Sequence, residues 1–147
     1  MDSANEISLD GFKVVSGDYF VHLSKSTSPT LTVWDGSICF SKQNILLLNK
    51  CENVLMQINA ADKRVVVFPT KSTDKDALKW IKKLDPLEAR RITCPRLTDM
   101  LYDMWKWDKD YIYRTEGKLV TSNNKVMMYF NFQAPESWKR PEAKNVK

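Results

Sequence analysis

The dipeptide Asp35-Gly36 is the strongest local constraint on the fold of this chain. It separates two β-rich tetrapeptides, Leu-Thr-Val-Trp at residues 31–34 and Ser-Ile-Cys-Phe at residues 37–40. A two-residue type I′ turn needs positive φ at both central positions, and Asp-Gly adopts this conformation readily. The sequence therefore predicts a tight hairpin over residues 31–40, and with it an antiparallel sheet.

Helices and strands are expected to alternate after this hairpin. Ser41 is a suitable N-cap for a short helix over residues 41–49, because its hydroxyl can accept a free backbone N–H of the first turn. Strands follow over residues 54–59 and 64–68, where β-branched and apolar residues predominate. Apolar residues then recur at helical spacing, which predicts a second helix over residues 74–83.

The second part of the chain predicts a similar series of elements. After a linker at residues 85–89, a strand is expected over residues 91–94. Pro95 suits the first turn of a helix, and the apolar residues that follow it predict an amphipathic helix over residues 95–107. Further strands are expected over residues 111–115, 118–121 and 125–132, with turns at residues 116–117 and 122–124.

These elements predict one α+β domain over residues 11–135, as expected for a chain of 147 residues. We expect a curved antiparallel sheet with helices packed on one face. Its two similar halves, of hairpin, helix and strands, are residues 30–84 and 90–134. Residues 1–10 are expected to be disordered, and residues 136–147 to form a basic C-terminal tail. Two further strands are expected over residues 12–15 and 19–23.

Positive charge is concentrated in the second half of the chain. Residues 1–70 carry six Lys/Arg and seven Asp/Glu, whereas residues 71–147 carry seventeen and eleven. Such a surplus suits a polyanion, because Lys and Arg neutralise phosphates and release counterions. The alternative is an ordinary solvated surface. The nucleic-acid-binding residues that we predict are Lys79, Lys82, Lys83, Arg90, Arg91, Arg96 and Arg114.

Aromatic residues interleave with this charge. Trp105, Trp107, Tyr111 and Tyr113 could offer stacking platforms to bases, or form a surface that contacts another protein. The alternative is that part of this set belongs to the core.

The residues favour no catalytic or metal site. The only histidine, His22, lies in a predicted strand without a nucleophile or acid nearby in sequence. Asp99 and Asp103 lie one helical turn apart, a spacing that suits a solvated helix face better than a metal site. Glycine-rich phosphate loops are also missing. We therefore expect neither an enzyme nor a cofactor.

Three cysteines, Cys39, Cys51 and Cys94, are odd in number and match no zinc-ligand spacing. They predict reduced thiols in a cytoplasmic protein. No apolar run approaches the length of a membrane span, and the first residues lack the pattern of a signal peptide.

Several sequence segments together resemble a family of small proteins of intestinal anaerobic bacteria. Its members occur near mobile elements and are often labelled "integrase" or hypothetical. The segments are residues 29–33, 38–42, 54–59, 63–67, 74–80, 91–94, 107–108, 110–114 and 117–120. The resemblance implies a setting linked to DNA and a longer C-terminal region in relatives. It does not imply recombinase chemistry, because one histidine cannot supply the set of Arg and His that a tyrosine recombinase needs.

The expected order of elements is also similar to a TATA-binding-protein-like arrangement, in which two halves form one curved sheet. Three functions follow as hypotheses. The first is a non-enzymatic accessory or regulatory protein of a mobile element that contacts DNA. The second is a protein-interaction module or homodimer without a nucleic-acid role, and the third, least favoured, is an enzyme.

Overall fold

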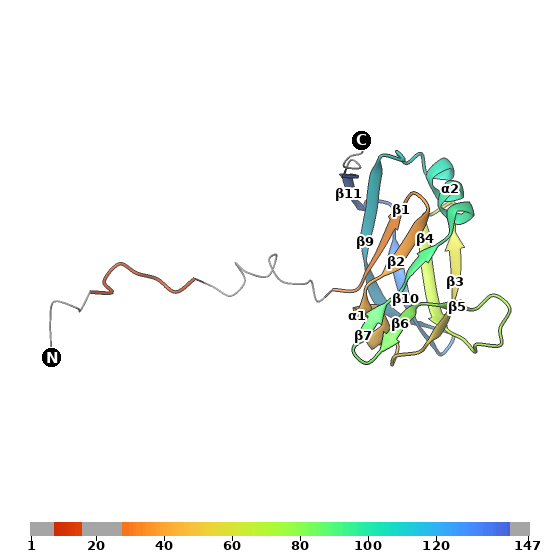
Figure 1. The fold of residues 1–147 in the computed structure, drawn as a ribbon, viewed down its shortest axis with the longest axis horizontal. Coiled ribbons are helices and arrows are strands. Elements are labelled where there is room, and N and C mark those ends of the chain that lie inside the picture. Colours follow the sequence, from red (N-terminus) through yellow and green to blue (C-terminus); the bar gives the residue numbers. More distant parts are fainter. Residues whose placement is uncertain (1–7, 16–27, 142–147) are drawn as a thin grey trace, which may run out of the picture.

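The protein is mostly β, and its main sheet is antiparallel and strongly curled into a half-barrel (Figure 1). The computed structural model describes residues 8–15 and 28–141. Within these residues there are two short helices and a small separate hairpin, β6–β7. The prediction of a curved antiparallel sheet is confirmed, whereas the α+β balance is wrong, because strands greatly outnumber helices.

The elements have the following bounds. The strands are β1 (Thr30–Trp34), β2 (Ser37–Phe40), β3 (Asn53–Asn59), β4 (Arg64–Pro69), β5 (Leu78–Lys79), β6 (Ile81–Leu84), β7 (Leu87–Ala89), β8 (Arg91–Thr93), β9 (Tyr111–Ser122), β10 (Lys125–Asn131) and β11 (Glu136–Lys139). The helices are α1 (Lys42–Leu47) and α2 (Pro95–Met104).

The late strands β9 and β10 lie in the middle of the sheet. Its order is β5-β3-β4-β10-β9-β1-β2-β8, and β11 pairs with the first part of β9. Strands from the first predicted half therefore lie on both sides of the β9–β10 pair. α1 lies beside the β6–β7 hairpin, and α2 lies at the opposite end of the sheet (Figure 1).

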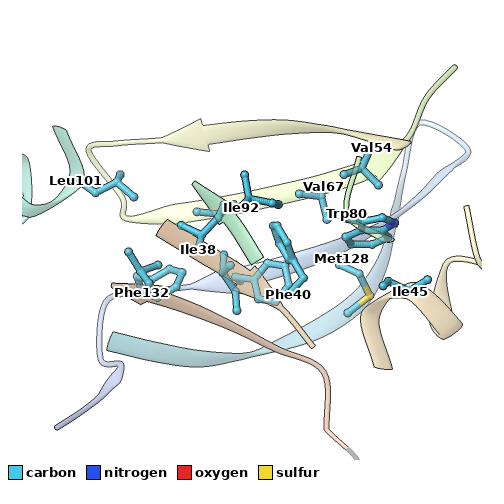
Figure 2. Packing of buried hydrophobic residues seen from close by; sticks show 14 of the residues in the cluster. Ile38, Phe40, Ile45, Val54, Val67, Trp80, Ile92, Leu101, Met128 and Phe132 are labelled. Carbon is cyan, nitrogen blue, oxygen red and sulfur yellow. The ribbon is translucent and has the colours of Figure 1, made fainter. Parts of the chain in front are cut away.

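The curled sheet encloses the core. Ile38 and Phe40 of β2 lie near its middle, and Trp80, Met128 and Ile45 meet at one end (Figure 2). Leu101 of α2 packs toward the other end with Phe132. Trp80 is fully buried, and its indole Nε1 donates a 2.7 Å hydrogen bond to the carbonyl oxygen of Cys51. Apolar burial of this kind is the main stabilising contribution in a domain of this size.

Several predicted elements are confirmed by the strand pairing. The Asp35-Gly36 hairpin is present as β1–β2, but its turn is not the predicted type I′, because Gly36 has a positive φ of 101° and Asp35 does not have a positive φ. Strands β3, β4, β8 and β10 and helices α1 and α2 occur where the sequence predicts them. Ser41 is the N-cap of α1, but its hydroxyl accepts the backbone N–H of Thr30 at 2.9 Å rather than one from the helix.

The predicted helix over residues 74–83 is wrong. This segment is a turn followed by β5 and β6, because Leu78 pairs with Val54 of β3 and Trp80 enters the core. The predicted linker at residues 85–89 is instead the turn of the β6–β7 hairpin and β7 itself. The predicted turn at Glu116-Gly117 is also wrong, because β9 runs through it without a break.

The ends of the chain differ from the prediction as well. Residues 12–15 form no strand, and Phe12, Val14 and Val15 are exposed. The sheet continues past residue 135 with β11, within the segment expected to be a tail. The predicted strand over residues 19–23, with His22, lies outside the described residues. So do residues 1–7 and 142–147 of the predicted disordered and basic ends.

Candidate nucleic-acid interface

Four of the predicted nucleic-acid-binding residues line one groove. The groove has a volume of about 650 Å³, and its lining residues are Lys79, Ile81, Lys82, Arg90 and Arg91. All four basic residues are exposed, and within the described part of the chain no acidic residue lines the groove. Lys82 forms an exposed ion pair with Glu88, with 4.0 Å between its Nζ and the Glu88 Oε1, so the groove has a net rather than a fully unpaired positive charge. Net positive charge in a concave site raises the local concentration of anions.

The β6–β7 hairpin brings these residues together. The chain leaves the sheet after Trp80 and returns at Arg90, whose backbone N–H donates a 2.9 Å hydrogen bond to the Trp80 carbonyl. Arg90 Nη1 donates a second bond of 3.0 Å to the carbonyl of Lys79. These two bonds hold the ends of β5 and β8 side by side, so residues eleven positions apart share one rim.

Arg91 is held more firmly than the other basic residues of the groove. Its Nε donates a 2.8 Å hydrogen bond to Ser37 Oγ, and its guanidinium carbon lies 4.3 Å from the centroid of the Trp34 ring. Arginine has five N–H donors in a planar fork, so the Nε bond leaves those of the two terminal nitrogens for a ligand. A guanidinium fixed by stacking loses less conformational entropy when it binds.

Lys82 also faces a second, larger cleft of about 700 Å³. The cationic side chains here are Lys42, Lys82 and Arg114, and they are matched by Glu88, Glu116 and Glu136. The predicted residue Arg114 belongs to this cleft, where its Nε donates a 2.9 Å hydrogen bond to Glu136 Oε1. This cleft is electrostatically mixed and is less suited to a phosphate backbone.

The remaining predicted basic residues lie elsewhere. Lys83 stands opposite Glu88 in the hairpin register, and Arg96 lies in the first turn of α2. Both are exposed, and neither lines the groove or the cleft.

Only part of the predicted aromatic set lies in the core. Trp105 is 3% exposed and donates its Nε1 hydrogen to the carbonyl of Ala60. Trp107 stacks on Tyr113 with ring centroids 4.1 Å apart, and both rings also contact Tyr102. Tyr111 is half-buried, and its carbonyl accepts the Tyr102 hydroxyl. Trp105 therefore offers almost no surface to a base, whereas Trp107, Tyr111 and Tyr113 are half-buried and keep part of theirs.

Two partly exposed tryptophans outside the predicted set carry aromatic surface. Trp34 ends β1, and Trp138 lies in β11, where its ring is 4.9 Å from the guanidinium carbon of Arg114. The alternation of β1 could have revealed the first, because Leu31 and Val33 point inward and Trp34 therefore points outward. Trp138 gives no such signal, because the sequence predicts a tail at its position.

The described residues contain no group of three His, Cys, Asp or Glu placed to hold a metal ion. Asp99 accepts a 2.7 Å hydrogen bond from Lys109, which also lies 3.8 Å from Asp35. Burial raises the pKa of the Cys39 and Cys94 thiols, and it raises that of Cys51 to about 11. These cysteines therefore remain protonated near neutral pH, which is not the state of a reactive nucleophile.

No helix of the described chain is both long and apolar enough to span a bilayer. The sequence matches no family model, and comparison with curated proteins and with solved structures yields no match. A function for this protein therefore has to be inferred from the geometry and charge of the groove.

Proposed function

We propose that this protein binds nucleic acid through the groove lined by Lys79, Lys82, Arg90 and Arg91. The single observation that carries the proposal is the convergence of four cations from two segments on a concave site, where only Lys82 has a carboxylate partner, Glu88, and no described acidic residue lines the groove. A phosphate backbone is the commonest ligand with repeated negative charge, and Lys and Arg bind it without regard to sequence. The protein acts as a non-enzymatic accessory or regulatory component, and the resemblance to proteins carried near mobile elements favours DNA.

The strand order gives limited support to the likeness with TATA-binding proteins. Only the curvature of the sheet agrees with it, because strands from the two predicted halves interleave around β9 and β10. We therefore place nucleic acid at the groove and not along the concave side of the sheet, which the core fills.

A titration with fluorescently labelled oligonucleotides tests this proposal. Anisotropy is measured with single-stranded and duplex ligands at about 50 mM salt and again at about 200 mM. We expect binding that weakens as salt rises. The double variant Lys79→Gln/Lys82→Gln should weaken binding and lower the slope of log K against log salt by up to about 0.9 for each phosphate that the protein no longer neutralises.

The matched control is Lys71→Gln/Lys118→Gln. It removes the same charge from exposed lysines outside the groove. Binding by the control should resemble binding by the unmodified protein. Failure of every ligand to bind at the lower salt concentration would sink the proposal, because phosphate-driven affinity is strongest there.

A second function, association between copies through a sheet edge, is favoured by one observation. Strand β11 pairs with β9 on one side, the described residues place no strand on its other side, and all four of its residues are exposed. An open strand edge of this kind can pair with another chain. Light scattering over a range of protein concentrations tests this, and a monomer throughout would remove the homodimer.

A further inference from the structure

Cross-strand pairing places a row of side chains on the outer face of the sheet, beginning at the groove. The row crosses β8, β2, β1, β9 and β11 through the directly paired residues Arg91, Cys39, Thr32, Arg114 and Glu136. Directly paired residues point to the same face of a sheet, and Thr32 lies between the inward-facing Leu31 and Val33. Three strand spacings separate Arg91 from Arg114, or roughly 14 Å.

The two tryptophans lie in the neighbouring row on the same face. Trp34 pairs with Ser37, and Trp138 pairs with Ile112 of β9. Ile112 is buried although it does not belong to the interior cluster, as expected for a residue covered on the outer face. The outer face thus carries two arginine–tryptophan stacks, Arg91 on Trp34 and Arg114 on Trp138.

Charge divides this face into two zones. At the β8 end the groove has a net positive charge even though Glu88 pairs with Lys82, whereas at the β11 end Glu136 neutralises Arg114 and Glu116 lies on the same strand. Phosphates favour the first zone and are repelled by the carboxylates of the second. A planar guanidinium over an indole is, by contrast, a good surface for an uncharged base, because bases stack on aromatic rings and on arginine planes.

From this arrangement we infer that the ligand is single-stranded nucleic acid. The phosphates at one end of the strand lie in the groove of Lys79, Lys82 and Arg90. The unpaired bases of the nucleotides that follow stack along the outer face on the Arg91–Trp34 and Arg114–Trp138 pairs. A duplex hides the faces of its bases in its own stack and cannot use these pairs. This inference rests on the proposed function, and it adds the class of nucleic acid and the residues that distinguish it.

The test compares three labelled ligands, each about ten nucleotides long. They are a thymidine homopolymer, a uridine homopolymer and a duplex DNA. At one salt concentration we expect at least one single strand to bind about ten-fold or more tightly than the duplex. The variant Trp34→Leu/Trp138→Leu should lose roughly five- to a hundred-fold in single-strand affinity and keep the salt slope of the unmodified protein. The thymidine and uridine arms show whether DNA or RNA is preferred, and tight binding of either supports the inference.

Tyr129→Leu is the matched control. Tyr129 is a half-buried aromatic residue on β10 with Arg64 over its ring, but it lies outside these two rows. Arg91→Lys retains the charge but removes the planar surface, and it should also weaken single-strand binding. This variant carries the test if the tryptophan variant does not fold. Duplex binding as tight as single-strand binding, or losses no larger than in the Tyr129→Leu control, would overturn this inference alone. Failure of all three ligands to bind would overturn the proposed function as well.

Discussion

The ring of Phe130 lies directly against Gly117 on the neighbouring strand. The two residues are paired in the β9–β10 register, and a Cβ atom built on residue 117 would lie 2.5 Å from Cε1 of Phe130. Phe130 is fully buried and lies 5.7 Å from Phe40 between ring centroids. The glycine therefore gives space to a core ring at the centre of the sheet.

Replacing this glycine should destabilise the fold. Gly117→Ala would force the Phe130 ring or the strand to move, and overpacking of this kind costs about 1–3 kcal/mol. Urea unfolding of the single variant measures the loss. The double variant Gly117→Ala/Phe130→Leu should lose less unfolding free energy than the two single variants lose together, because the smaller leucine side chain removes the clash. Simple additivity would show that the ring and residue 117 do not compete for space.

The hydrogen bond from Trp80 to the Cys51 carbonyl gives a second prediction. Trp80→Phe keeps an aromatic ring but removes the indole N–H, so the partly buried Cys51 carbonyl loses its donor. We expect a loss of about 1–3 kcal/mol in the free energy of unfolding. Trp138→Phe serves as the control, because Trp138 is an exposed residue of β11. An equal cost in both variants would argue against a role for the hydrogen bond.

Asn44 joins the start of β1 to α1, which predicts a third effect. It is fully buried, and its Nδ2 donates hydrogen bonds of 2.9 Å to the Thr30 carbonyl and 3.1 Å to the Ser41 carbonyl. Asn44→Leu removes both donors at similar volume and should cost about 1–3 kcal/mol. Gln43→Leu, at the half-buried preceding position, provides a comparison by thermal unfolding. A larger loss at position 43 than at position 44 would contradict this prediction.

Stability should fall at alkaline pH. Burial raises the pKa of the Cys51 thiol from 9.0 to about 11, and burial also raises the pKa of the Tyr102 hydroxyl. Above pH 9 the unfolded chain loses the Cys51 proton while the folded protein keeps it. The stabilising contribution is therefore complete below pH 9 and is lost as pH rises through about 11.

Urea midpoints measured from about pH 8 upward test this alkaline loss. Cys51→Ala removes one of the titrating groups, so its midpoint should fall less steeply over the same interval. A midpoint that stays constant up to pH 11 in the unmodified protein would contradict the prediction.

Local sequence signals predicted the elements whose formation depends on local chemistry. Asp35-Gly36 has the turn residues of the β1–β2 hairpin, and Pro95 with the helical period after it predicted α2. At residues 74–83 the helical spacing of apolar residues predicted a helix that does not form. Leu78 and Trp80 are fixed by β3 and by the Cys51 carbonyl, which are contacts with distant residues that no local pattern reveals.

Some residues of the candidate site could likewise be predicted from the local sequence, and others could not. Charge density alone singled out Lys79, Lys82, Arg90 and Arg91, and the hairpin then brings them to one groove. Arg114 has the same charge but lies in the mixed cleft, and its partner Glu136 is 22 residues away in sequence. The alternation of β1 was enough to mark Trp34 as outward-facing, whereas Trp138 lies in a segment predicted to be a tail and could not be distinguished from the aromatic residues near α2.

The central position of β9 and β10 also determines when this chain can fold. Thr32 pairs with Arg114, 82 residues later, and Val66 pairs with Tyr129. During synthesis the β1–β2 and β3–β4 hairpins emerge first, and β5 and β8 can then extend them, but the two parts of the sheet are joined only when residues 111–131 leave the ribosome. Closure of such long loops is entropically costly and is typical of slow folding. Both early parts of the sheet would expose unpaired strand edges throughout that interval, and such edges favour aggregation of incompletely folded chains.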